Sequence, residues 1–136
     1  MGIEVNAADP RSLFEEAAQA VAAVEADIEG DPPAAVWDTI SLEAGDLPAL
    51  AFAWLNKIIG LSETHHAVLV GLFVDRLNLA PSADDRARWT LRARAGFRAY
   101  GGRDVRPRCH VKAASLEGLT VRQDHEAWVL TANLET

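Results

Sequence analysis

The stretch RARWTLRARAGFR, residues 86–98, alternates almost without a break between arginine and an apolar residue. A period of two is typical of a β-strand, in which successive side chains point to opposite faces of the sheet. One face of this predicted strand carries Arg86, Arg88, Arg92, Arg94 and Arg98, and the other carries Ala87, Trp89, Leu91, Ala93, Ala95 and Phe97. The stretch therefore predicts a strand with one apolar face and one strongly basic face.

The basic face contrasts with the chain as a whole, which has a net charge of −7 and a pI of about 5.0. Residues 86–122 carry a net charge of +8, whereas residues 1–85 carry −12. One interpretation is a solvated sheet face, because arginine stems cover apolar neighbours while the charged heads stay in water. The other is a docking site for phosphate or carboxylate, because five cations without acidic residues on the same strand repel one another.

Length and composition predict one globular domain over residues 1–136, with 49% hydrophobic and 24% charged residues. A single cysteine, Cys109, excludes an internal disulfide and is typical of a reducing compartment. The N-terminus lacks the pattern of a secretory signal. The longest apolar stretch, residues 47–61, is interrupted by Asn56 and Lys57 and is shorter than the ~20 residues that a membrane span needs. We expect a soluble, cytoplasmic protein with no membrane partner.

Apolar spacing and capping residues predict helices over residues 9–27 and 46–61, capped by Asp9 and Asp46. The predicted strands cover residues 2–5, 36–44, 67–74, 86–98, 109–116, 119–123 and 127–135. This order predicts an α+β fold, a two-layer α/β sandwich with two helices packed on a mostly antiparallel β-sheet. The expected core includes Phe14, Val21, Trp54, Leu55, Leu91 and Val111.

Motifs for autonomous catalysis are missing from the sequence. It contains no GxxxxGK[ST], GxGxxG or GxSxG pattern. Cys109 and His110 are adjacent, so on a strand they face opposite ways and cannot form a nucleophile–base pair. His65 and His66 fall in a predicted loop without a nearby carboxylate, which is a weak metal signal. The sequence therefore indicates a protein that is not an enzyme.

Several stretches, taken in order, resemble the archease family. GIEVNAADPRSLFEEAAQAV, residues 2–21, is similar to its first strand and helix, and LPALAFAWLNKII, residues 47–59, to its second helix with Trp54-Leu55-Asn56. HVKAASLEGLTV, residues 110–121, resembles a strand and turn in which Lys112 and Ala113 match and Ser115 replaces the usual Thr. AWVLTANLET, residues 127–136, is similar to the closing strand.

The resemblance implies an accessory protein, not a catalyst. Members of the family promote the guanylylation and multiple turnover of an RtcB-type RNA ligase in tRNA splicing and RNA repair. The expected partner is therefore that ligase, with tRNA reached only indirectly through it. The resemblance also implies a divalent metal site, for calcium or magnesium, built from an N-terminal Asp and a C-terminal Asp.

This chain departs from the family at that metal site. The family's His-Thr-Ala-Asp run would precede Met1, and Glu135 stands at the C-terminal Asp position, with Thr136 supplying main-chain and terminal carboxylate oxygens. Leu116 and Glu117 replace a usual aromatic residue and His. A hard-cation site needs several oxygen ligands, so we expect weak or absent metal binding. One hypothesis is that Met1 is a misplaced GTG start and that the Asp codon lies upstream.

Two functional interpretations follow for the basic strand. In the first, Arg88, Arg92 and Arg94, with Lys112 on a neighbouring strand, dock an acidic surface of the ligase or its bound RNA or nucleotide. In the second, the chain is a small RNA-binding module that uses the Arg86–Arg98 strand for phosphates. The second lacks aromatic side chains on the arginine face of that strand, and the acidic N-terminal region repels nucleic acid. A metal-dependent hydrolase is disfavoured because no paired carboxylates are evident.

Overall fold

The alternating stretch forms the central strand of a three-stranded antiparallel sheet. The computed structural model describes residues 1–81 and 87–136. In it β5 (Ala87–Ala99) pairs with β3 (Val36–Ala44) along one edge and with β4 (Ala67–Pro81) along the other. A bulge between Val74 and Arg76 shifts the register of β4 against β5. The arginines of β5 therefore have neighbours on both sides.

A second antiparallel sheet is built around the C-terminal strand. Its strands are β1 (Gly2–Ala7), β7 (Ala113–Ala114), β8 (Thr120–Asp124) and β9 (Ala127–Glu135). β9 pairs with the whole of β1 through its residues 128–133, and it also pairs with β8 and with β7. A separate pair is formed by β2 (Ala26–Ile28) and β6 (Val105–Pro107).

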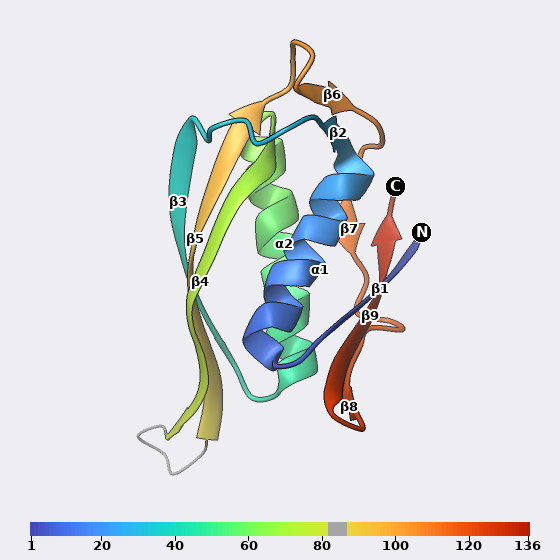
Figure 1. Cartoon of the computed structure of the whole chain (residues 1–136). Helices are drawn as coiled ribbons and strands as arrows, with labels where there is room; N and C mark the ends of the chain where they lie inside the picture. The colour runs from blue at the N-terminus through green and yellow to red at the C-terminus, as the bar shows by residue number, and fades with distance from the viewer. Residues whose placement is uncertain (82–86) are drawn as a thin grey trace.

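Two helices lie between the sheets (Figure 1). α1 (Pro10–Glu25) begins after Asp9, whose side chain accepts a hydrogen bond from Ser12 N at 2.8 Å. α2 (Leu47–His65) begins in the same way after Asp46, which accepts from Ala49 N at 2.8 Å. These caps satisfy backbone donors that the helix itself leaves unpaired. Both predicted helix starts are confirmed to within a residue.

The α+β class and the packing of two helices on mostly antiparallel strands are confirmed. The structure refines the two-layer expectation, because strands cover both sides of the helical layer (Figure 1). α1 contacts β4 on one side and β1 and β9 on the other. Strand periodicity shows which face of a strand is apolar, but not how many sheets share one core.

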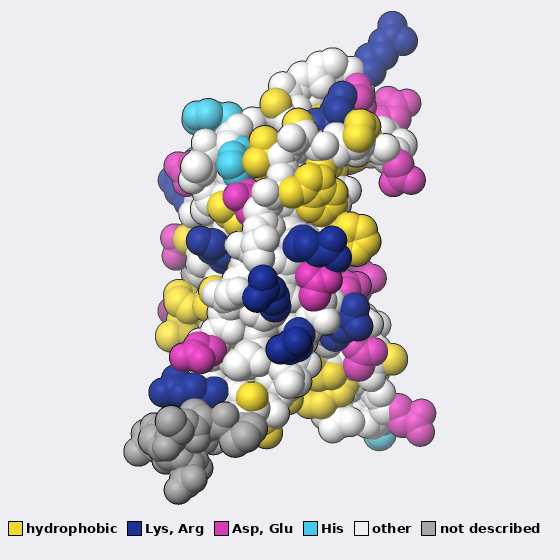
Figure 2. All heavy atoms as spheres, turned by 90° about the vertical axis from the view of Figure 1, so that its left-hand side faces the viewer, with side chains coloured by type: hydrophobic (Ala, Val, Ile, Leu, Met, Phe, Trp, Pro, Cys, Tyr) yellow, Lys and Arg dark blue, Asp and Glu magenta, His cyan; other side chains and the backbone are white. Residues whose placement is uncertain are grey.

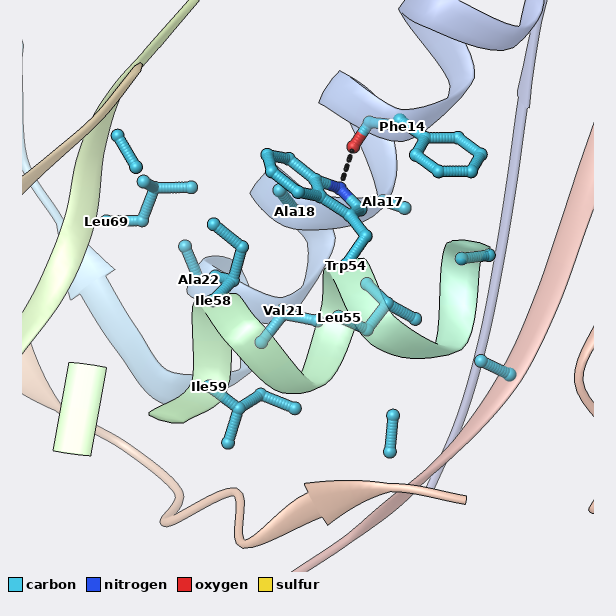
Figure 3. Close-up of a cluster of buried hydrophobic side chains, with 14 of the residues drawn as sticks. Phe14, Ala17, Ala18, Val21, Ala22, Trp54, Leu55, Ile58, Ile59 and Leu69 are labelled. Carbon is cyan, nitrogen blue, oxygen red and sulfur yellow. Dashed lines mark hydrogen bonds between the residues drawn. The ribbon is translucent and has the colours of Figure 1, made fainter. Parts of the chain in front are cut away.

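The core lies between the helices and the inner faces of the sheets. Its largest fully buried side chains include Trp54, Phe14 and Phe97. Figure 3 shows Trp54 from α2 packed against α1, where its indole Nε1 donates to the Phe14 carbonyl oxygen at 2.9 Å. All six residues of the expected core are buried.

Three predicted elements differ from the structure by several residues at one end or more, whereas the other predicted boundaries agree to within about two residues. α2 continues beyond residue 61 to His65 and ends where His66 adopts a left-handed backbone, with φ 50°. β4 continues to Pro81 instead of ending at residue 74. The predicted strand 109–116 is reduced to Ala113–Ala114, because Arg108 N and Cys109 N donate to the Glu25 carbonyl at the end of α1 instead of to a strand.

Neither helix in the described ranges is long and apolar enough to cross a membrane.

Candidate functional site

The arginine face of β5 is the outer surface of the β3-β5-β4 sheet. Arg92 and Arg94 are exposed and Arg88 and Arg98 are half-buried, whereas Ala93, Ala95 and Phe97 between them are buried. The predicted division into a basic and an apolar face is thus confirmed for the described residues, and Arg86 lies outside them. Figure 2 looks onto this outer face and shows basic side chains interspersed with acidic and hydrophobic ones.

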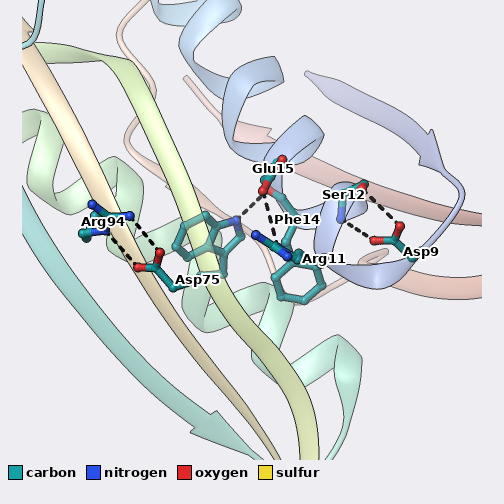
Figure 4. Close-up of polar contacts among 8 residues, drawn as sticks. Asp9, Arg11, Ser12, Phe14, Glu15, Asp75 and Arg94 are labelled. Atoms are coloured by element: carbon teal, nitrogen blue, oxygen red, sulfur yellow. Dashed lines mark hydrogen bonds and ion pairs between the residues drawn. The ribbon is translucent and has the colours of Figure 1, made fainter.

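Two of the arginines are neutralised by acids from other parts of the chain. Arg94 donates through Nε and Nη2 to Asp75 of β4 at 3.0 and 2.9 Å (Figure 4). This paired guanidinium lowers the pKa of Asp75 below its usual range. Arg98 donates to Asp104 at 3.2 Å and to the Pro33 carbonyl at 3.1 Å. The sequence of β5 contains no acidic residue, and it does not show that Asp75 and Asp104 reach these arginines from other segments.

Arg92 has a different environment. It lies opposite Ser41 of β3 and opposite Arg76 of β4. Within residues 1–81 and 87–136, neither Arg76 nor Arg92 forms an ion pair. A depression of about 550 Å³ runs beside them, with Glu43 and Asn78 among its lining residues. Like charges directly opposite each other in a sheet are unfavourable, so this pair is the part of the face best suited to attract an anion.

An aromatic pair completes the outer face. Trp37 of β3 and Phe73 of β4 stack with ring centroids 5.8 Å apart, and about half of each side chain is exposed. The Arg94 guanidinium lies 4.8 Å from the Phe73 ring centroid, within the range of a cation–π contact. As expected, Trp89 and Phe97 of β5 lie on the opposite face from the arginines, but the neighbouring strands β3 and β4 supply the aromatic side chains of this sheet face.

Two glycines make room for Trp37. A Cβ atom at Gly71 would lie 2.7 Å from the indole, and one at Gly96 would lie 3.0 Å from it. The indole therefore lies flat on the backbone of β4 and β5, which only glycine permits. A signal for this feature was present in the sequence, since Trp37 shares the otherwise polar face of residues 36–44 with Thr39, Ser41 and Glu43.

Lys112 does not belong to this face. The prediction that it lies on a strand next to the arginines is wrong, because the neighbours of β5 are β3 and β4. Lys112 instead precedes β7, and its backbone N donates to the Glu135 carbonyl at 2.7 Å. Lys112 is thus adjacent to the predicted metal ligands in the other sheet, not to Arg92.

The predicted metal ligands lie at the end of β9. The Glu135 carboxylate accepts a hydrogen bond from Ser115 Oγ at 3.0 Å, and Glu135 and Thr136 are both exposed. Within residues 1–81 and 87–136, no group of three or more His, Cys, Asp or Glu side chains is placed to hold a metal ion. One carboxylate side chain is too few for a hard-cation site, so these residues by themselves do not fit one.

The pairing of β1 with β9 determines which position lies opposite Glu135. Met1 N donates to the Leu134 carbonyl at 3.0 Å, and Leu134 N donates to the Met1 carbonyl at 2.6 Å. Since the register is antiparallel, a residue joined before Met1 would lie opposite Glu135. An acidic residue joined at that position would therefore be brought next to Glu135 by strand pairing.

The Trp54-Leu55-Asn56 run has a structural role. The Asn56 side chain donates to the Phe52 and Ala114 carbonyls at 3.0 and 3.1 Å and accepts from Ala114 N at 2.9 Å. It thereby holds β7 against α2. An amide side chain can donate to these carbonyls and also accept from this N–H, which explains the Asn in the middle of an apolar helix.

His65 was predicted to lie in a loop without a carboxylate, and both parts of that prediction are wrong. It is the last residue of α2, and its Nε2 lies 2.7 Å from Asp38 Oδ2. Its ring packs against Phe97 with centroids 5.5 Å apart. The His65–Asp38 pair joins α2 to β3, so its role is structural.

Three comparisons with known proteins bear on this architecture. A family model described as the archease protein family matches residues 1–134. The solution structure of protein 1598 of Methanobacterium thermoautotrophicum is similar with a TM-score of 0.73 and 19% identity, covering 99% of this chain and 91% of that one. A Thermotoga maritima archease, described as a possible chaperone, has a TM-score of 0.59 and 14% identity, covering 100% and 90%. No curated protein matches the sequence.

Proposed function

Since this chain belongs to the archease family, we propose that it is an accessory protein of an RtcB-type RNA ligase. In this role it promotes guanylylation of the ligase and its multiple turnover in tRNA splicing and RNA repair, and it meets tRNA only through the ligase. The observation that carries the proposal is the family match over residues 1–134. The description of the Thermotoga archease as a possible chaperone supports an accessory role of this kind.

The outer face of the β3-β5-β4 sheet is the proposed docking surface. Arg88, Arg92 and Arg94 lie along its central strand, and Arg92 with Arg76 supplies positive charge that forms no ion pair within the described ranges. Arg94 is already paired with Asp75, so its contribution is to hold the Phe73 edge of the surface in place. Complementary charge mainly speeds encounter and fixes orientation, which suits an activator that must dissociate between turnovers.

Glu135 and Thr136 are the proposed contributors to a calcium or magnesium site at the other sheet. Their carboxyl and main-chain oxygens are the ligand type that such hard cations take. Because Glu135 is the one carboxylate side chain in this pair, the proposed affinity is weak. Lys112, next to Glu135, belongs to this end of the molecule.

The test is a guanylylation assay with the RtcB-type ligase of the same genome. The ligase is incubated with GTP and divalent metal, with and without the full chain, and both the guanylylated fraction and the number of ligations per ligase molecule are measured. We expect the chain to raise both quantities. Equal values with and without the chain, at concentrations up to a large excess over the ligase, would contradict the proposal.

A second candidate function, direct binding of single-stranded RNA, is favoured by one observation. The half-exposed Trp37–Phe73 pair lies on the same face as Arg92 and Arg94. Base stacking on aromatic side chains next to a basic groove is how many proteins bind single strands without sequence preference. A filter-binding titration with an oligonucleotide, at two salt concentrations and without ligase, separates this function from the first.

A further inference from the structure

A cavity of about 280 Å³ lies where the C-terminal ends of α1 and α2 meet the segments that follow β5 and β6. Glu25, the last residue of α1, and Ser62, in the last turn of α2, line it. Glu63, His66, Tyr100 and His110 add further polar groups, while Ile59 and Val111 supply apolar wall. None of these residues belongs to the outer sheet face or to the predicted metal ligands.

Two of these lining residues each carry a buried polar atom that has no hydrogen-bond partner in the described part of the chain. The two atoms are Glu25 Oε1 and Ser62 Oγ. Glu25 is only 5% exposed and Ser62 only 3%. Buried polar groups in folded proteins are nearly always paired, because an unpaired one loses its hydration without compensation. Two such atoms in one cavity wall indicate that the cavity takes a hydrogen-bonding guest.

The electrostatics of the cavity select the charge of that guest. The carboxyl ends of two helices carry partial negative charge, and the last turn of α1 has no basic residue. The lining contains two carboxyl groups and no Lys or Arg. Arg108, two residues before His110 in the sequence, is directed instead to the Ala23 carbonyl and Asp27. A cation is therefore favoured and an anion is disfavoured.

The same lining argues for an organic cation with N–H donors. An ionised Glu25 carboxylate can only accept hydrogen bonds, and Ser62 Oγ can accept as well as donate, so a guest with N–H donors can pair with both. Within residues 1–81 and 87–136, no three His, Cys, Asp or Glu side chains are arranged to hold a metal ion. Ile59 and Val111 suit an alkyl chain, and a volume of about 280 Å³, just below the roughly 300 Å³ at which sites for drug-sized ligands begin, suits a small guest.

We propose that this cavity binds an alkylammonium group, with its nitrogen donating to Glu25 and Ser62 and its methylene chain against Ile59 and Val111. The proposal is independent of the ligase and RNA proposals. Burial raises the pKa of Glu25 to about 7, and burial together with the charge of Glu25 raises the pKa of Tyr100. A bound ammonium group would offset the unfavourable burial of negative charge on Glu25, which is the cause of its raised pKa.

The test is a calorimetric or NMR titration of the full chain with n-butylammonium chloride at pH 8, at constant ionic strength. Tetramethylammonium, which lacks N–H donors, and n-butyrate, which has the opposite charge, are the control ligands. We expect saturable binding of n-butylammonium and no binding of either control. Absence of saturable binding up to about 20 mM n-butylammonium, about twentyfold above the roughly 1 mM Kd that corresponds to about 4 kcal/mol, would overturn the proposal.

Variants locate the binding to the cavity. We expect Glu25→Gln to weaken n-butylammonium binding at least tenfold and Ser62→Ala to weaken it several-fold. Glu16→Gln, an exposed change on the same helix, is the matched control and should leave the affinity unchanged. Glu25→Gln removes a buried charge, so folding is preserved. Equal binding by wild type and Glu25→Gln would show that the ammonium binds elsewhere and would overturn the assignment.

Two sources could supply the group, and the titration distinguishes them. Putrescine represents a free diamine, and Nα-acetyl-lysine methylamide represents the lysine side chain of a partner protein. Tighter binding of putrescine than of n-butylammonium assigns a free polyamine, with Glu63 as the second anchor. Comparable binding of the lysine derivative and n-butylammonium assigns a partner's lysine, because the backbone is then accommodated at the cavity mouth.

Discussion

Arg76 of β4 and Arg92 of β5 lie directly opposite each other in the sheet, and no acid within residues 1–81 and 87–136 pairs with either. Two residues along β5, Arg94 forms a two-bond ion pair with Asp75. The two arginines thus differ in role although they share one face and one strand. This difference makes it possible to separate docking from stability by mutation.

Arg92→Thr tests docking. We expect the free energy of unfolding to stay within about 0.5 kcal/mol of wild type, because the change is on the surface and relieves a like-charge contact. Stimulation of ligase guanylylation should fall roughly threefold to tenfold at low salt and less at high salt, since steering by exposed charge is screened. Thermal unfolding and the guanylylation assay measure the two effects.

Arg94→Thr is the matched control on the same face. It removes the ion pair with Asp75 and the contact with Phe73, so the melting temperature should fall. Asp75→Asn should act in the same direction, and the double variant should lose less than the sum of the two. If Arg92→Thr stimulates the ligase as well as wild type, the basic face is only a solvated surface.

Trp37→Ala tests the RNA-binding candidate. If bases stack on the Trp37–Phe73 pair, affinity for a single-stranded RNA oligonucleotide should fall by about 1–3 kcal/mol per lost stacking partner. Leu116→Ala removes a comparably exposed apolar side chain in the other half of the molecule and should have no effect. Fluorescence anisotropy measures both. Failure of the wild-type chain to bind the oligonucleotide at low salt would exclude this function.

Asn56→Ala tests the structural role of the Trp-Leu-Asn run. It leaves the Ala114 N–H and carbonyl without their side-chain partner. We expect a loss of about 2–4 kcal/mol in the free energy of unfolding, since each unpaired buried group costs about 1–3 kcal/mol. Lys57→Ala, exposed on the same helix, should change stability by less than about 0.5 kcal/mol. Denaturant titration would show equal losses for the two if Asn56 had no such role.

Glu25→Gln tests the buried carboxyl through pH. The pKa of Glu25 is raised by burial from 4.5 to about 7, so the folded state holds this proton more tightly than the unfolded state. The resulting stabilisation is complete below about pH 4.5 and is lost as the pH rises through 7, by up to about 3 kcal/mol. Glu25→Gln should lack this loss and should be more stable than wild type at pH 8.

The comparison between the two proteins isolates Glu25. Its other titratable neighbours in the cavity are Glu63, His66, Tyr100 and His110, and all are the same in both proteins. Apart from the electrostatic coupling by which Glu25 raises the pKa of Tyr100, their contributions therefore cancel in the difference between the two stability profiles. A difference that is flat between pH 4.5 and 8 would show that Glu25 keeps an ordinary pKa.

The metal proposal predicts weak binding by the chain as given. Joining His-Thr-Ala-Asp before Met1 should tighten calcium or magnesium binding at least about tenfold, because the new carboxylate would lie opposite Glu135 on the β1–β9 ladder. His-Thr-Ala-Asn at the same place is the matched control and should give little gain. Calorimetry with both ions measures the affinities, and tight binding by the unextended chain would contradict the prediction.

The sequence by itself determined the local elements and their faces. Alternation placed Leu91, Ala93 and Phe97 in the core and Arg92 and Arg94 in solvent, and it delimited β3 to the residue. Asp9 and Asp46 marked both helix starts because capping depends only on neighbours a few residues away. The ordered motifs also indicated the family, which the match over residues 1–134 establishes.

Only the tertiary structure decided which elements become neighbours. Asp75 reaches Arg94 from 19 residues away, and Trp37 and Phe73 meet across β5, which separates their strands. The same holds for Lys112, which lies beside Glu135, and for the cavity that brings Glu25 to Ser62. Periodicity predicts on which face of its own strand or helix a side chain lies. Strand order, and hence every cross-strand partner, depends on how all apolar faces are buried together.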